Sequence, residues 1–391
     1  MSTADLRFKL ISPVDPRWAR TNAVSDVRLC AALARQGHDV EWIVPSLGHG
    51  KELSAEGVFR LHDVTDSFAI RFVRTPRWDG PRDVARIVPL MVRGVASTLP
   101  PSRRRATFAI SRDMRLLAPL LAATPPRVCA IPWLHEYRAR FFERWACGRA
   151  ECIFATNSVI VDDVRRDAGD RPAFITGNPV LEAHAQSVRM TRREARAAIG
   201  IEGDRPLVVY TGKLVPGMAE LDHLLHAAKR LRNCHFVLTG GQPQALEAVN
   251  AELARRHIDN VILTGFLPSS TEIRVYQQAA SVLVSYYSVR DHKFARQNLP
   301  NKLAEYMSTG NPVVVADFPA VRDLATSETA VLVEPDDPEA FVMALLNALD
   351  ETGQISKMAA RAQDVVRERS FERVAAQMYD FLSSRFVNAE N

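Results

Sequence analysis

Residues 299–315, LPNKLAEYMSTGNPVVV, decide the fold that we expect for the C-terminal half of the chain. Pro300 suits the first turn of a helix, so this helix is expected to run from Asn301 to about Ser308. The valines that follow Pro312 form a short apolar run, which is typical of a strand buried on both faces of a sheet. A helix that leads into such a strand predicts an α/β fold with a parallel sheet.

The same alternation of strands and helices extends outward from this stretch. In the C-terminal half, apolar strands separated by helical segments are expected at residues 207–212, 235–241, 260–265, 281–287, 312–316 and 330–335. In the N-terminal half, the sequence predicts a strand at 8–13, a helix at 23–36, and further strands at 39–45, 69–73, 127–132, 152–156 and 173–177. Since 391 residues exceed what one core usually holds, the sequence predicts two Rossmann-like domains.

We place the N-terminal domain at residues 1–180, a polar linker at 181–205 and the C-terminal domain at 206–368. A last helix, at 369–391, is expected to pack back on the N-terminal domain. Open α/β sheets bind ligands at the carboxyl ends of their strands. We therefore expect the functional residues in the loops after the strands, facing a cleft between the two domains.

The composition is that of a folded globular protein, with 47% hydrophobic and 24% charged residues. No apolar run approaches the roughly 18 residues of a membrane span, and the first residues lack the apolar segment of a signal peptide. These features predict a cytoplasmic protein. The five cysteines, an odd number without a zinc-binding spacing, predict buried thiols and no metal site.

Arginines are concentrated in one part of the N-terminal half. Residues 71–150 contain sixteen arginines, no lysine and five acidic residues, a net charge of +11, whereas the whole chain carries +5. Such a basic block indicates an anionic partner. Within it, apolar residues recur at helical spacing: Val84, Ile87, Val88, Met91 and Val95. Arginines lie elsewhere on the same helical wheel, at Arg82, Arg86 and Arg93, and just beyond it, at Arg103, Arg104 and Arg105. The pattern fits a core-facing helix or peripheral docking on an anionic membrane, and nucleic acid fits poorly because no binding module accompanies the charge.

Lys302 and Glu305 are three residues apart in the expected helix and therefore share one face near its N-terminus. A cation together with the N–H groups of a helix N-terminus is suited to binding a diphosphate. A carboxylate one turn further on can accept hydrogen bonds from two neighbouring hydroxyls, such as those of a ribose. The same spacing also fits an ordinary ion pair on a helix surface.

The stretch PNKLAEYMSTGNPVV resembles the nucleotide-sugar signature of glycosyltransferase family 4, retaining enzymes with the GT-B fold of two Rossmann-like domains facing across a cleft. The resemblance covers about the whole chain and is strongest between Val208 and Pro335. Further motifs occur in the family's order and spacing: YTGKL at 210–214, LTGG at 238–241, GFLPSSTEI at 265–273, TNSVIVDDV at 156–164 and GNPV at 177–180. Their combined order is more specific than any one motif.

The resemblance implies how the donor would be bound. Glu305 would hold the ribose hydroxyls, Lys302 and Lys213 would bind the diphosphate, and backbone groups near Phe266 and Leu267 would contact the base. The full donor-binding set that it implies is Gly212, Lys213, Gly240, Phe266, Leu267, Gln297, Asn298, Leu299, Asn301, Lys302 and Glu305. The residues expected to act in catalysis, without a metal ion or another cofactor, are His135, Lys213, Lys302 and Glu305.

Residues of the N-terminal half are expected to bind the acceptor. His135 and Glu136 resemble a His-Glu pair at the family's cleft, and the alternative is that His135 is a histidine satisfied near the core. Arg112, at an expected helix start, lies on the cleft side by analogy. Asn22 is expected to cap the first helix and could also face the donor phosphate or the acceptor.

Three positions depart from the family pattern. Gln297 stands where many members have a glutamate, and Met218 stands where many have a basic residue. The first loop, residues 17–22, lacks the frequent pair of glycines. A neutral Gln297 can bond to a sugar hydroxyl, but it cannot stabilise positive charge on an oxocarbenium-like centre.

Together these features predict a retaining glycosyltransferase that moves a hexosyl-type group from a UDP- or GDP-linked sugar to an acceptor hydroxyl. The acceptor is expected to be a glycan, a lipid-linked or phosphorylated precursor, or a small molecule. Because of Gln297, a scaffold protein that binds nucleotide sugars with impaired catalysis is an alternative. A nucleotide-sugar epimerase is a third possibility, but it needs additional carboxylates that the sequence does not place.

Overall fold

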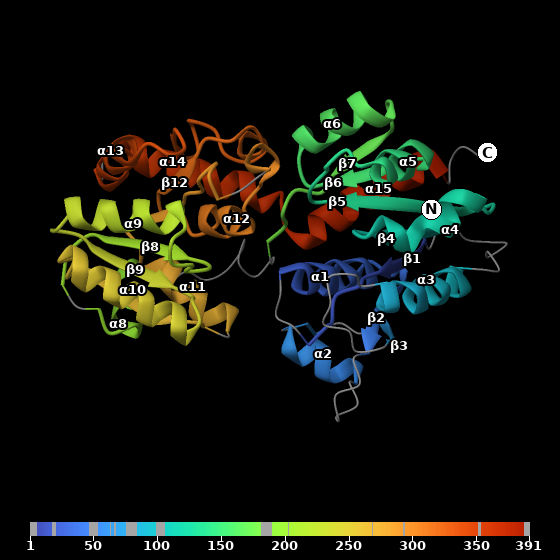
Figure 1. Cartoon of the computed structure of the whole chain (residues 1–391), viewed down its shortest axis with the longest axis horizontal. Helices are drawn as coiled ribbons and strands as arrows, with labels where there is room; N and C mark the ends of the chain where they lie inside the picture. The colour runs from blue at the N-terminus through green and yellow to red at the C-terminus, as the bar shows by residue number, and fades with distance from the viewer. Residues whose placement is uncertain are drawn as a thin grey trace. The chain divides into compact units, whose positions relative to one another are not determined.

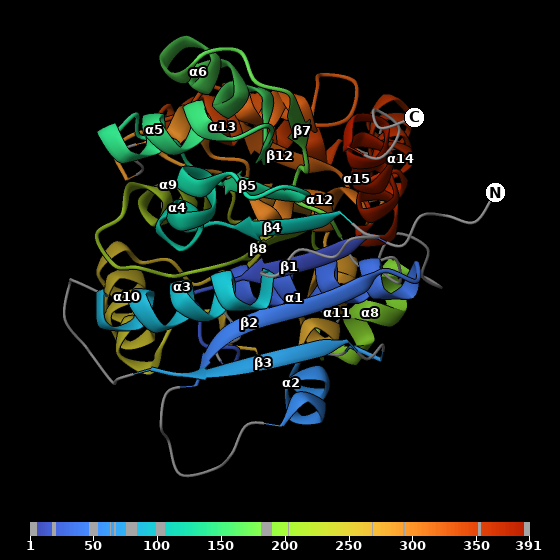
Figure 2. The same ribbon diagram turned by 90° about the vertical axis from the view of Figure 1, so that its right-hand side faces the viewer.

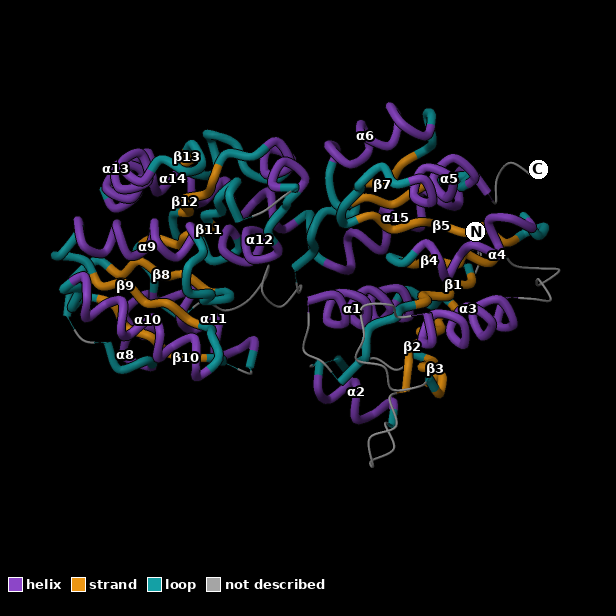
Figure 3. Tube along the Cα trace, viewed as in Figure 1, coloured by secondary structure: helices purple, strands orange, loops and turns teal. Residues whose placement is uncertain are grey.

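The chain divides into two compact units, each a parallel β-sheet with helices around it (Figures 1 and 3). Unit 1 comprises Met1–Leu181 and Ser370–Asn391, and unit 2 comprises Glu182–Arg369. The structure is a computed structural model, and it describes residues 6–17, 21–46, 54–62, 64–65, 68–75, 84–98, 106–180, 190–201, 203–267, 269–291, 294–350 and 353–386.

Unit 1 is built around a sheet with the strand order β3-β2-β1-β4-β5-β6-β7. Its strands are β1 (Arg7–Ile11), β2 (Asp39–Ser46), β3 (Ala69–Arg74), β4 (Thr107–Ser111), β5 (Val128–Leu134), β6 (Ile153–Ala155) and β7 (Ala173–Ile175). Neighbouring strands pair in parallel, as β1 does with both β2 and β4. The central strands are buried on both faces, which explains why they read as apolar runs in the sequence.

Helices cover both faces of this sheet. They are α1 (Thr21–Arg35), α2 (Ala55–Leu61), α3 (Val84–Thr98), α4 (Met114–Ala123), α5 (Phe141–Arg149), α6 (Ser158–Ala168) and α15 (Phe371–Phe386). One apolar cluster contains Trp42 and Phe108 and includes Met378 of α15. A second contains Ile43 and Leu117, and Figure 2 shows α3 on this side, beside β1 and β2.

The last helix of the chain, α15, packs within unit 1. Val180 and Ser370 form a parallel β-bridge, which brings the chain back to the unit immediately before α15 begins. Arg35 Nη1 of α1 lies 2.6 Å from Glu372 Oε1 of α15. The buried face of α15 includes Met378, which belongs to the core of unit 1. The helix therefore contributes apolar surface to a sheet formed by residues far earlier in the sequence.

Unit 2 has a sheet with the strand order β10-β9-β8-β11-β12-β13. Its strands are β8 (Leu207–Thr211), β9 (His235–Thr239), β10 (Val261–Gly265), β11 (Val282–Ser285), β12 (Val313–Ala316) and β13 (Val331–Val333). Its helices are α8 (Arg192–Ala198), α9 (Ala219–Arg230), α10 (Pro243–Arg256), α11 (Ser270–Ala279), α12 (Asn301–Met307), α13 (Pro338–Leu349) and α14 (Gly353–Arg367), with short 3-10 helices η1 (Ala295–Gln297) and η2 (Pro319–Asp323). The order reverses between β8 and β11, which is the switch point of a doubly wound sheet.

The two parallel α/β sheets confirm the predicted fold class. The strands expected in the C-terminal half are all present, because each is a continuous apolar run. In unit 1, β4, α2, α5 and α6 are not among the elements that the sequence predicts. The sequence of β4, TFAIS, mixes small and polar residues with apolar ones and so hides a strand whose residues are all buried between β1 and β5.

The apolar stripe of α3 faces the core of unit 1. Ile87 is 6% exposed, and Met91 and Val95 pack against the same apolar cluster. Val88 is 46% exposed and lies outside this contact. The side chains of Val84 and Arg86, together with Arg82 and residues 103–105, lie outside the described part of the structure.

The five cysteines are buried and form no disulfide, as the sequence predicts. Among the described helices, none combines the length and the apolar character that a membrane crossing requires.

Candidate functional site

Three glycines meet at the carboxyl ends of adjacent strands in unit 2. The Gly212 N–H, after β8, donates to Thr239 O at 3.0 Å, and the Gly240 N–H, after β9, donates to Gly265 O at 2.7 Å. Gly240 has φ +116°, and a Cβ atom there would lie 1.8 Å from Gly212 O. Only glycine fits this approach, which brings the ends of β8 and β9 together at the edge where such sheets bind ligands.

Gly212, Gly240 and Gly265 together are called the glycine shelf here. Lys302 lies beside them, in the first turn of α12. Its Nζ atom is 3.8 Å from the ring centroid of Tyr210 and 4.9 Å from that of Tyr287. Glu220 Oε1 of α9 is 3.6 Å away. A Cβ atom at Gly212 would lie 3.1 Å from Nζ. The ammonium is thus held at the end of β8 by two aromatic faces and one carboxylate.

The environment of Lys302 lowers the pKa of its ammonium group. Its side chain is 10% exposed, and this burial lowers the pKa to about 8, while Glu220 acts in the opposite direction. The interpretation of Lys302 and Glu305 as an ion pair on a helix surface is wrong, because the charged partner of Lys302 in the described structure is Glu220.

Glu305 lies one turn beyond Lys302 on α12. Its side chain is half-buried, and Gln277 Nε2 of α11 donates to Oε2 at 3.4 Å. Arg274 of the same helix donates to the carbonyls of Glu305 and Ser308, at 3.0 and 3.1 Å. These bonds anchor the end of α12 to α11 and so fix the position of the carboxylate.

Lys213 and Phe266 occupy the loops next to the glycine shelf. Lys213 is exposed, and its carbonyl accepts a hydrogen bond from Tyr210 Oη at 3.2 Å. Phe266 follows β10 and is 61% exposed, and the neighbouring Leu267 is half-buried. Both loops therefore present accessible groups at the carboxyl edge of the sheet.

The segment before α12 is more enclosed than the sequence suggests. Gln297 ends η1 and is 5% exposed, and Leu299 is 7% exposed. Asn298 is half-buried, whereas Asn301 is exposed at the start of α12. Met218, at the position where the family often has a basic residue, precedes α9 as its N-cap and is half-buried.

In unit 1, Arg112 follows β4 at the carboxyl edge of that sheet. Its Nη2 atom lies 3.0 Å from Asp26 Oδ1 and donates to Ser25 Oγ at 2.9 Å. Its guanidinium carbon is 4.1 Å from the ring centroid of Trp133. Nη1 donates to Asn22 O at 3.4 Å. The expectation that Asn22 caps α1 is wrong, because the helix begins one residue earlier and Asn22 is part of its first turn.

His135 follows β5, and its ring centroid is 5.3 Å from that of Trp133. Nε2 is enclosed and has no hydrogen-bond partner among the described residues. Burial and the Arg112 charge lower the pKa of His135 well below its ordinary value. Glu136 forms an ion pair with Arg138, at 2.8 Å between Oε1 and Nε. Arg112 and His135 thus both lie against the ring of Trp133, whereas Glu136 is paired with Arg138.

His135 is expected to stay neutral at pH values where an ordinary histidine is charged. The unfolded chain binds a proton near pH 6.5 that the folded imidazole does not bind, so this group reduces the free energy of unfolding as the pH falls below about 6.5. NMR titration of the His135 ring measures this directly, and a midpoint at an ordinary histidine value contradicts the expectation. Arg112→Met is expected to raise the midpoint.

Sequence reasoning missed the groups that surround these cations. They are Glu220, Tyr210 and Tyr287 in unit 2, with Asp26 and Trp133 in unit 1. The two acids could have been found from the sequence. Each lies on the apolar stripe of its helix, where an unpaired charge is costly, so its position predicts a buried cationic partner. Asp26 lies between Ala23 and Cys30 on α1, and Glu220 precedes Leu224 by one turn of α9.

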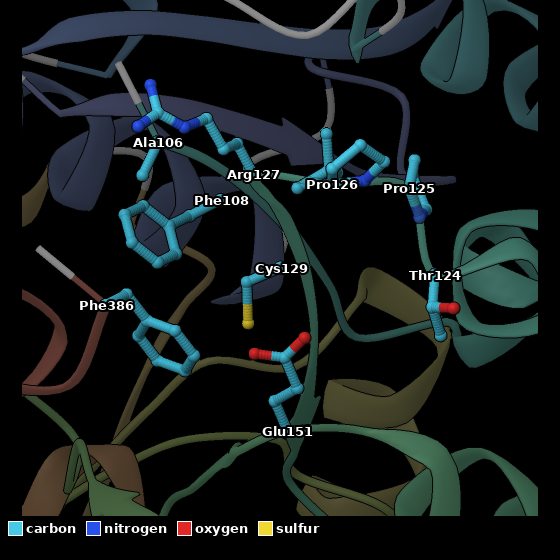
Figure 4. A pocket seen from close by; sticks show the side chains of 10 residues that line it. Ala106, Phe108, Thr124, Pro125, Pro126, Arg127, Cys129, Glu151 and Phe386 are labelled. Carbon is cyan, nitrogen blue, oxygen red and sulfur yellow. The ribbon is translucent and has the colours of Figure 1, made fainter. Parts of the chain in front are cut away.

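Two cavities in the described part of the chain lie away from these residues. One of about 260 Å³ in unit 1 is lined by Phe108, Cys129, Glu151 and Phe386 (Figure 4). Another, of about 770 Å³ in unit 2, is lined by α8, by residues that precede β8 and β11, and by Leu349 at the end of α13. Both lie toward the amino ends of the strands, and none of the expected site residues lines them. Among the described residues, no group of three or more His, Cys, Asp and Glu side chains is placed to hold a metal ion.

Residues 205–351 match the family model described as Glycosyl transferases group 1. A related sequence is alpha-D-kanosaminyltransferase from Streptomyces kanamyceticus, which is 28% identical over 226 residues. This alignment covers 51% of the chain and 55% of that enzyme, so the chain spans about half the length of this relative.

Two solved structures resemble the whole chain. Sucrose-phosphate synthase from Thermosynechococcus elongatus has a TM-score of 0.76 at 16% identity, with 98% of this chain and 100% of that chain covered. Anabaena HepE in complex with UDP has a TM-score of 0.73 at 13% identity, with 97% and 100% covered. The chain therefore has the GT-B fold, and within it residues 205–351 match the model of the group 1 glycosyl transferases.

Proposed function

We propose that the protein is a family 4 retaining glycosyltransferase, which transfers a hexosyl-type group from a UDP- or GDP-linked sugar to an acceptor hydroxyl. The observation that carries the proposal is the Lys302 ammonium, held beside Gly212 at the end of β8. This point adjoins the place where the strand order of unit 2 reverses, at which doubly wound sheets bind nucleotides. The names of the relatives agree: one is a kanosaminyltransferase, and HepE was solved with UDP and with UDP-glucose.

The donor diphosphate would lie over the glycine shelf. Lys302 is held there by packing, and Lys213 lies on the exposed loop next to it. As the glycosidic bond breaks, negative charge develops on the diphosphate, and two positioned cations stabilise it without requiring a metal ion. Glu305, one turn along α12, would accept hydrogen bonds from the ribose hydroxyls.

Retention of configuration follows if the acceptor attacks from the face that the diphosphate leaves. The acceptor oxygen forms the new bond to the anomeric carbon, and the departing phosphate oxygen takes the acceptor's proton. No carboxylate base is needed in this step, which is consistent with the neutral Gln297 at a position where many members have a glutamate.

We place acceptor recognition in unit 1, at the carboxyl ends of β4 and β5. Arg112 supplies a cation and His135 supplies a neutral imidazole whose Nε2 lacks a partner among the described residues. The net charge of +11 over residues 71–150 favours an anionic acceptor, either a phosphorylated glycan precursor or a lipid-linked one at a membrane surface.

A panel of nucleoside diphosphates and nucleotide sugars tests this function. A ligand at 100 times its dissociation constant stabilises the folded protein by about 2.7 kcal/mol, so the cognate nucleotide is expected to raise the melting temperature by several degrees. Donor hydrolysis and transfer to added acceptors are then measured with that nucleotide sugar. Stabilisation without any turnover would favour the scaffold alternative, and the absence of stabilisation by every compound contradicts the proposal.

A further inference from the structure

Glu220 is the charged group in contact with the Lys302 ammonium in the described part of unit 2. Its Oε1 atom lies 3.6 Å from Nζ, and the two side chains are 8% and 10% exposed. Glu220 occupies the first turn of α9, where its backbone N–H donates to Asp291 Oδ2 at 2.9 Å. The carboxylate and the ammonium therefore come from different helices, and the fold of unit 2 sets their separation.

The other groups around the ammonium are aromatic. Nζ lies over Tyr210 of β8 and near Tyr287 in the loop after β11. Burial raises the pKa of both phenols, so neither carries a charge near neutral pH. Because the side chains of Glu220 and Lys302 are both almost fully buried, solvent screens the charge of Glu220 only weakly, and this charge acts on any anion that binds to Lys302.

We propose that Glu220 is a counter-ion built into the diphosphate site, which holds the Lys302 ammonium in place and weakens its binding of the nucleoside diphosphate that leaves. This inference rests on the function proposed above. Glu220 does not touch the reacting atoms, so it is a positioning residue. Its charge sets the balance between stabilising the leaving diphosphate and releasing it.

The charge of Glu220 acts most on product release. When the bond between the anomeric carbon and the phosphate oxygen breaks, the oxygen keeps the electron pair, and the acceptor's proton passes through it to water. The nucleoside diphosphate then carries one more negative charge than it did within the nucleotide sugar. Repulsion by Glu220 is consequently stronger for the product than for the donor.

Calorimetric titrations of the wild type and of Glu220→Gln test the proposal. At about pH 6.5, UDP or GDP, whichever the wild type binds, is expected to bind roughly tenfold more tightly to Glu220→Gln, with a smaller gain for the matching nucleotide sugar. Glu220→Asp keeps the charge on a shorter side chain, so its affinity is expected to lie between the two. It also replaces Glu220→Gln if that variant does not fold.

Asp222→Asn is the matched control. It removes the same charge from the same turn of α9, at a side chain that is 53% exposed and paired with Arg256, and it is expected to leave both affinities unchanged. Equal or weaker nucleotide binding by Glu220→Gln overturns the inference while the proposed function stands. A wild type that binds neither nucleoside diphosphates nor nucleotide sugars overturns both.

The pH dependence of nucleotide binding distinguishes the proposed role of Glu220 from a merely structural one, which would leave this dependence unchanged. Glu220 raises the pKa of Lys302 against the effect of burial, so its loss lowers this pKa further. Nucleotide affinity in the wild type is expected to fall as the pH rises past about 8. In Glu220→Gln the fall is expected to begin at a lower pH, and identical profiles overturn the inference.

Discussion

Replacing Gly240 with alanine is expected to destabilise unit 2 by about 3 kcal/mol or more and to abolish nucleotide binding. The residue has φ +116°, a conformation that L side chains rarely adopt, and its Cβ would lie 1.8 Å from Gly212 O. The obstacle is backbone, which cannot turn aside as a flexible side chain would. Relief of the contact must therefore separate the ends of β8 and β9, where the proposed diphosphate site lies.

Gly217→Ala is the matched control for this prediction. Gly217 lies in the loop between β8 and α9 and has φ +85°, but a Cβ there would meet no atom within 4 Å. Its replacement is expected to cost only the backbone strain, about 1 kcal/mol, and to leave nucleotide binding near the wild-type value. Urea denaturation and calorimetry of both variants measure the difference. Equal losses of stability would show that the close approach at Gly240 does not matter.

Lys302→Met is expected to weaken nucleoside diphosphate binding by roughly 100-fold and to lower the transfer rate at least as much. The variant keeps the volume of the side chain but removes the buried cation next to the glycine shelf. It also leaves Glu220 without its charged partner, so a loss of stability is expected as well.

The double variant Lys302→Met/Glu220→Gln separates these two effects. It removes both charges, so its free energy of unfolding is expected to return toward the wild-type value, whereas nucleotide binding stays weak. Lys229→Met, at an exposed lysine in the last turn of α9, controls for the change in net charge. If the double variant recovered nucleotide affinity together with stability, Lys302 would not be the diphosphate cation.

The sequence carried most of the information about the fold, because strands buried on both faces must be apolar throughout. LVVYT of β8 and VVVA of β12 are of this kind and were placed to within one or two residues. The sequence of β4 lacks the signal, since its burial depends on neighbours that the local sequence does not specify. The start of α1 differs from the expected one by two residues, which is the usual uncertainty of a helix end, and this difference moves Asn22 from the cap into the first turn.

For the site, the sequence by itself determined which segments end at the carboxyl edge of the unit 2 sheet, because element order and turn glycines are local properties of the chain. It thereby located Gly212, Gly240 and Lys302 at one edge. Tertiary structure alone decided that Lys302 pairs with Glu220 and lies over Tyr210, since α9, β8 and α12 meet only when the sheet assembles. A side chain's protonation and partners depend on every element that packs around it, and no local pattern encodes that environment.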